Sequence, residues 1–174
     1  MRCMTTAIVR ANGLDVSSVT EGQGTPLLML HGATSTGTRD WGAQRPLLRA
    51  EFTLYMPDAR GHHRTRYDVR EGWSREMLVD DALAFADALG LPRFHIMALA
   101  MGARTALELA VRHADRVLSM LVIAPMVRPE PGASVARARM ASAAPVSSVA
   151  TSPFCLRVGW RRSVVLGTWW VRWM

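Results

Sequence analysis

Residues 94–104, FHIMALAMGAR, decide the fold of this chain. The stretch begins as an apolar run that fits a buried strand, breaks at small residues, and resumes with the apolar spacing of a helix. We therefore expect a strand, a tight turn and a helix in direct succession, with a single residue at the turn. Ala100 occupies that position. Ala98 and Gly102, two residues to either side, are small enough for strand and helix to approach closely.

Strand-like and helical patterns alternate around this stretch. Two β-like runs flank Asn12-Gly13, a dipeptide that favours a tight hairpin turn. Apolar spacing places further strands at 26–30, 52–56, 94–98 and 117–124, and helices around Pro46, at 75–89 and at 100–113. This order predicts an α/β fold with a mostly parallel, doubly wound sheet. The pattern provides no strand after the sixth, at 117–124, so we expect the sheet to be truncated there.

Charge and composition divide the chain at about residue 130. Residues 1–130 have 15 arginines against 14 acidic residues, whereas residues 131–174 have six arginines, no acid and four of the six tryptophans. We therefore expect a partial α/β core over 1–130 and a basic, acid-free, Trp-rich tail over 131–174. Because soluble domains rarely run so far without an acid, we interpret the tail as sequence that is truncated or read out of frame. A lid and a membrane-touching segment are the alternatives.

Neither the net positive charge nor the two cysteines indicate a nucleic acid, metal or cofactor partner. All 21 basic residues are arginine, and the excess charge belongs to the tail, so it gives no reason to expect nucleic acid binding. Cys3 and Cys155 lie far apart and form no C-x-x-C pair. No apolar leader and no run of about 18 apolar residues is present. We expect a cytoplasmic protein that needs no metal or cofactor.

Four motifs follow one another at spacings that leave room for helices between them. They are PLLMLHG at 26–32, MPDARGH at 56–62, FHIMALAMGARTALELAVRH at 94–113 and VLSMLVIAP at 117–125. In order and spacing they resemble the N-terminal half of an α/β-hydrolase of the small esterase, lactonase or carbon–carbon-bond hydrolase type. The resemblance covers residues 6 to about 128 and implies a small, apolar, ester-like ligand.

The resemblance implies a role for the residues around the turn. The backbone amides of Ala33 and Met101 would form the oxyanion hole, in which main-chain N–H groups bind developing negative charge. His31 and Gly32 form the motif that leads into the first of these amides. Since both donors belong to the backbone, the identity of their side chains matters little.

A second matching segment follows the strand at 52–56. Asp58 and Gly61 fit the family's D-x-x-G turn, where a carboxylate bonds loop amides and glycine takes a conformation closed to other residues. His63 stands where the family usually has another glycine, so we expect this loop to be distorted. His62 and His63 have no third ligand at a suitable spacing, and we interpret them as part of a solvated loop rather than a metal site.

Two departures from the family determine the expected activity. Ala100 replaces the family's serine nucleophile, and its methyl group can neither lose a proton nor attack a carbonyl. Histidines occur only at 31, 62, 63, 95 and 113, and none follows the sixth strand, where the fold places the general base. Glu130 follows that strand, where some relatives keep their acid, but an acid without a base orients nothing. We expect a catalytically inactive protein.

Three hypotheses remain open. The first is an inactive fragment of a hydrolase, from a frameshifted or Ala-substituted gene. The second is a non-enzymatic protein that binds a small molecule in the pocket of this fold. The third, which we disfavour, is a membrane-associated protein anchored by the Arg and Trp tail. In the first case the strand at 117–124 has an unpaired apolar edge, so we expect self-association.

Overall fold

The computed structural model describes residues 4–125, 163–166 and 169–172. Its strands form one sheet in the order β1-β2-β4-β3-β5-β6-β7-β8. The strands are β1 (Thr5–Ala11), β2 (Leu14–Gly22), β3 (Thr25–Leu30), β4 (Phe52–Pro57), β5 (Phe94–Leu99), β6 (Val117–Ile123), β7 (Ser163–Leu166) and β8 (Trp169–Arg172). The helices are α1 (Arg45–Leu48), α2 (Arg75–Ala88) and α3 (Met101–Arg112). None of the helices in this part of the chain is long and apolar enough to cross a membrane.

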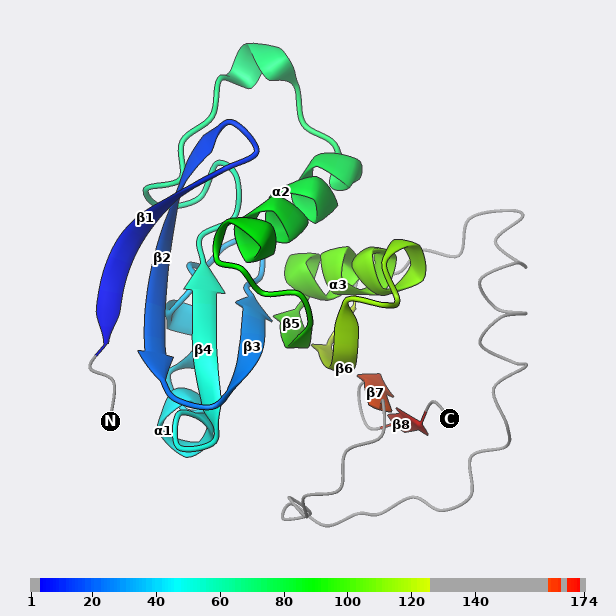
Figure 1. The fold of residues 1–174 in the computed structure, drawn as a ribbon. Helices are drawn as coiled ribbons and strands as arrows, with labels where there is room; N and C mark the ends of the chain where they lie inside the picture. The colour runs from blue at the N-terminus through cyan, green and yellow to red at the C-terminus, as the bar shows by residue number, and fades with distance from the viewer. Residues whose placement is uncertain (1–3, 126–162, 167–168, 173–174) are drawn as a thin grey trace, which may run out of the picture.

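The hairpin and the parallel part of the sheet form as the sequence predicts. β1 and β2 pair antiparallel around Asn12 and Gly13, whose positive φ angles of 46° and 74° suit a tight turn. β2 pairs antiparallel with β4, β3 pairs in parallel with β4 and β5, and β5 pairs in parallel with β6. The expected α/β fold with a mostly parallel sheet is confirmed (Figure 1).

The edge of the sixth strand differs from the prediction. Residues 120–122 of β6 pair in parallel with residues 164–166 of β7, and β8 pairs antiparallel with β7. The sheet therefore continues beyond β6 by two short strands, and the unpaired edge expected there is occupied. β7 has only four residues, SVVL, and so short a run shows no periodicity by which it could be recognised. Residues 131–162 of the predicted tail lie outside the described residues.

Helices cover both faces of the sheet (Figure 1). α2 and α3 lie on one face, where Phe85 and Leu109 join Leu28 and Ile96 of the central strands in the larger core. The opposite face has a smaller core around Trp41, on the side of α1. Because β3, β4 and β5 are parallel, the loops that follow them meet at one edge of the sheet, where ligands of α/β proteins bind.

A buried ion pair joins the loop after β4 to α2. The Arg60 guanidinium, whose residue is only 4% exposed, donates to the Asp81 carboxylate from Nε and from Nη2, both at 2.9 Å. Asn12 Nδ2, in the β1–β2 turn, also donates to this carboxylate, at 2.6 Å. The hydrogen bonds from Arg60 to Asp81 raise the pKa of the guanidinium. The pair therefore fixes the start of the loop against the helix.

Asp81→Asn is expected to lower the free energy of unfolding by about 3 kcal/mol, because it leaves the buried Arg60 without its counter-charge. Asp80→Asn is a matched change at the exposed neighbouring position of α2. It should alter the free energy of unfolding by less than about 0.5 kcal/mol. Urea denaturation followed by circular dichroism measures both variants. Equal stability of the two would show that the ion pair does not anchor the loop.

Candidate functional site

The turn between β5 and α3 is strained. Ala100 has φ 49° and ψ −103°, a conformation that costs a residue with a Cβ on the order of 1–3 kcal/mol. Its amide donates to the carbonyl of Ile123 at the end of β6, at 3.0 Å, and its carbonyl accepts from the amide of Arg104, at 3.2 Å. Hydrogen bonds on both sides of the turn thus hold the strained residue at the carboxyl edge of the sheet.

Small residues let α3 begin directly against the end of β3. A Cβ atom at Gly102 would lie 2.3 Å from the carbonyl oxygen of Leu30, far inside van der Waals contact. The Gly102 amide donates to the carbonyl of His31 at 3.1 Å, which ties the two elements together. Ala98 is fully buried and pairs with Leu30 in the sheet. Both positions therefore need the small residues that the sequence provides.

Two backbone amides beside the turn, those of Ala33 and Met101, have no hydrogen-bond partner among the described residues. Met101 begins α3, so its amide lies at the positive end of the helix dipole. Ala33 is exposed and follows Gly32. A Cβ placed at Gly32 would lie 3.7 Å from the Cβ of Ala100, so this loop passes close to the turn. Both amides that the resemblance singles out are thus without a hydrogen-bond partner among the described residues.

His31 fixes the peptide that contains the Ala33 amide. The amide of Ala59 donates to His31 Nε2 at 2.9 Å, so the ring proton is on Nδ1, which donates to the carbonyl of Gly32 at 2.7 Å. The Gly32 carbonyl and the Ala33 amide belong to one planar peptide and point in opposite directions. Burial lowers the pKa of His31, which favours the neutral ring that this bonding requires.

Two carboxylates brace the same loops. Asp40 accepts from the amide of Gly32 at 2.8 Å. Asp58, at the end of β4, accepts from the amide of Gly37 at 2.8 Å, so its carboxylate bonds a loop amide as the motif implies. The loop after β3 is thus held at both ends by acceptors from neighbouring segments.

The loop after β4 has a left-handed backbone conformation at both positions where the family has glycine. Gly61 has φ 76° and His63 has φ 48°. The Nδ1 atom of His63 lies 2.9 Å from Oδ2 of Asp58, and this bond holds the ring over the loop. The distortion expected at His63 is therefore a strained backbone in a conformation that suits glycine. Its side chain is half exposed.

His62, which the sequence places in a solvated loop, bridges two segments instead. Its Nε2 lies 2.8 Å from the carbonyl oxygen of Ala33, and its Nδ1 lies 3.0 Å from the carbonyl oxygen of Arg60. The ring meets that of His31 edge-on, with centroids 4.9 Å apart. His62 directly follows the D-x-x-G segment at 58–61, but nothing in the sequence shows which carbonyls its ring reaches.

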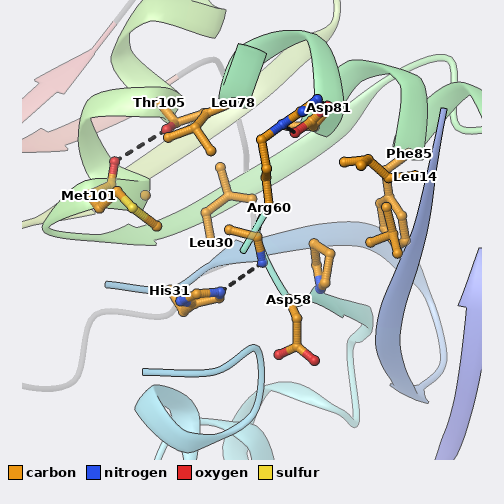
Figure 2. A pocket seen from close by; sticks show the side chains of 15 residues that line it. Leu14, Leu30, His31, Asp58, Arg60, Leu78, Asp81, Phe85, Met101 and Thr105 are labelled. Carbon is orange, nitrogen blue, oxygen red and sulfur yellow. Dashed lines mark hydrogen bonds and ion pairs between the residues drawn. The ribbon is translucent and has the colours of Figure 1, made fainter. Parts of the chain in front are cut away.

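An apolar cavity of about 40 Å³ lies beside the turn, between the sheet and helices α2 and α3. Figure 2 shows His31 and Met101 on one side of this cavity and Leu14 and Phe85 on the other. The volume gives room for about three water-sized groups. It therefore fits the small end of a ligand and not a large ligand as a whole.

The remaining histidines lie away from the turn. His95, near the start of β5, bonds Ser119 Oγ of β6 at 2.7 Å through Nδ1, and burial lowers its pKa. It is a packed and hydrogen-bonded residue of the sheet. His113 follows α3 at the end opposite Ala100. In the described residues, no three His, Cys, Asp or Glu side chains come together as a metal site.

Gly102→Ala should lower the free energy of unfolding by about 3 kcal/mol, because the new methyl group meets backbone atoms of Leu30 that cannot move aside. Gly42→Ala is the matched control, since a Cβ there has nothing within 4 Å. That control should leave stability within about 0.5 kcal/mol of the parent. Chemical denaturation gives both values. Similar stability of the two variants would contradict the close approach of α3 to β3.

Comparison with known proteins places most of the described residues within one family model. A model described as the alpha/beta hydrolase fold matches residues 25–146. Fluoroacetate dehalogenase from a Burkholderia species is 30% identical to this chain over 120 residues. That alignment covers 67% of this chain and 39% of the dehalogenase.

Solved structures show the same similarity. A variant of the epoxide hydrolase from Vigna radiata superposes with a TM-score of 0.69 at 25% identity, over 81% of this chain and 45% of that one. A meta-cleavage product hydrolase from Pseudomonas fluorescens, in a serine-to-alanine variant complexed with acetates, gives a TM-score of 0.63 at 26% identity. The superposition covers 69% of this chain and 44% of the Pseudomonas hydrolase. The chain thus spans about two fifths of the length of these relatives.

Proposed function

Because this chain belongs to the α/β-hydrolase fold family, we propose that it binds the carboxylate or carbonyl group of a small acid or ester without carrying out covalent hydrolysis. The observation that supports this is the turn itself. Ala100 keeps a strained conformation, φ 49° and ψ −103°, although its side chain is only a methyl group. The amides of Ala33 and Met101 beside it offer donors for negative charge.

The covalent step lacks its reacting groups in the described part of the chain. A methyl group at position 100 has neither an ionisable proton nor a lone pair. His31 and His62 have both ring nitrogens engaged with backbone groups, so neither ring is available as a general base. His63, held through Nδ1 by Asp58, is the described histidine beside this loop whose Nε2 is left without a partner. Binding without turnover is the chemistry that these groups support.

The related proteins support the ligand class. The Burkholderia dehalogenase is named for fluoroacetate, which is a small carboxylate. The Pseudomonas hydrolase that was solved with acetates carries alanine in place of a serine. A methyl group at position 100 is smaller and less polar than a hydroxymethyl group, and in this proposal a ligand oxygen takes the place beside the two amides. A small carboxylate places its oxygens against N–H donors and its short carbon chain against apolar residues, which suits the cavity beside the turn.

The parent protein should not hydrolyse p-nitrophenyl acetate above the uncatalysed rate, because loss of a serine nucleophile lowers the turnover number by on the order of a million-fold. Ala100→Ser should restore almost nothing, since an unassisted serine hydroxyl is a poor nucleophile at neutral pH. Purified parent and variant are compared by absorbance. Esterase rates that survive purification would overturn the proposal.

Substantial recovery in Ala100→Ser would show that a base is present. His63 would then be the first candidate, and the double variant with His63→Gln identifies it. The binding half of the proposal is measured separately by calorimetric titration of the parent with sodium acetate and with acetamide. Each ligand is added up to about 100 mM, far above the concentrations at which proteins usually bind metabolites. Absence of binding heat from both ligands over this range would contradict the proposal.

A further inference from the structure

The His62 ring lies between two carbonyl oxygens. Its Nε2 faces the oxygen of Ala33 at 2.8 Å and its Nδ1 faces the oxygen of Arg60 at 3.0 Å. A carbonyl oxygen can only accept a hydrogen bond, and a neutral imidazole has only one N–H to donate. Both bonds can therefore form together only when both ring nitrogens carry a proton. The bridge requires the imidazolium form of His62.

No carboxylate of the described residues bonds the His62 ring and neutralises this charge. Asp58 is engaged by His63 and by the amide of Gly37, and Asp40 by the amide of Gly32. The neighbouring charged groups of the same loop are Arg60, whose guanidinium is turned to Asp81, and the exposed Arg64.

The ring that faces His62 is that of His31. Burial lowers the pKa of His31, and the charge of His62 adds to this effect. His31 therefore stays neutral, and His62 is the ring whose two carbonyl contacts call for a second proton.

The bridge acts on the residue that supplies one of the site's donors. His62 bonds the carbonyl of Ala33, and the amide of the same residue is one of the two unpartnered donors beside Ala100. His31 already fixes the preceding peptide through the Gly32 carbonyl. Ala33 is thus held on both sides, and the His62 ring bonds its carbonyl oxygen. Near the positive end of α3, a second positive group favours an anion over a neutral ligand of the same shape.

We infer that His62 is a specificity-determining positioning residue, whose imidazolium makes the site beside Ala100 select a carboxylate over a neutral carbonyl compound. The inference rests on the function proposed above. When His62 loses its proton, one carbonyl bond breaks and the positive charge disappears. Carboxylate binding should therefore weaken as pH rises through the range in which histidine deprotonates, whereas binding of a neutral ligand should change little.

The test is calorimetric titration of the whole chain with acetate and with its neutral analogue acetamide, at about pH 6 and about pH 8, where histidine changes charge and acetate does not. The parent should bind acetate about five- to tenfold more tightly at the lower pH, a change of about 1 kcal/mol or slightly more. His62→Gln, which retains one N–H donor and no charge, should bind acetate equally at both pH values. His63→Gln, the matched change one residue further, should keep the pH dependence of the parent.

A second measurement does not depend on the variants folding. Titrations of the parent with acetate near pH 7, in two buffers of different ionisation enthalpy, report the protons taken up on binding. We expect fractional proton uptake with acetate and none with acetamide. Equal acetate affinity at both pH values, absence of proton uptake, or loss of the dependence in His63→Gln would overturn the role of His62. Acetate and acetamide binding with equal affinity would also overturn it and leave the proposed function standing, whereas failure of both ligands to bind ends both proposals.

Discussion

The site depends on the contact between the backbone of Gly102 and the carbonyl of Leu30. With a Cβ at Gly102 only 2.3 Å from that oxygen, no other residue fits there without moving β3 or α3. Because α3 begins so close to β3, the chain between β5 and α3 must turn within one residue. Ala100 takes up this turn, at φ 49°. The same contact brings the amide of Met101 beside the loop that carries Ala33.

Hydrogen bonds of two histidines hold the loops beside this turn. His31 is buried and neutral. Its Nε2 accepts from the Ala59 amide, and its Nδ1 donates to the Gly32 carbonyl. His62 faces two carbonyls and requires a second proton. One ring thus sets the direction of the Gly32–Ala33 peptide, and the other bridges the two loops beside it. Binding is the function we propose for this site because it uses these features and needs no hydroxyl group at position 100.

The sequence predicts most of the fold because its strongest signals are local. Asn12-Gly13 makes the hairpin turn, and Ser74 caps α2 by accepting from the amide of Met77 at 3.2 Å. The strained turn at Ala100 can likewise be read from the small residues around it. The four-residue strand β7 is too short to show a period, and it is fixed by pairing with β6. The bridge made by His62 joins residues 29 positions apart, so it depends on tertiary structure that no local pattern encodes.

The most direct test of the central claim is an amide nitrogen–proton NMR titration of the assigned protein with acetate. We predict that the resonances of Ala33 and Met101 shift together and saturate at a common dissociation constant, because acetate oxygens accept hydrogen bonds from both amides. Most other amides should move little. Shifts confined to the arginines of the loop after β4, or no saturable shift at Ala33 and Met101, would contradict the claim that the turn around Ala100 is a binding site.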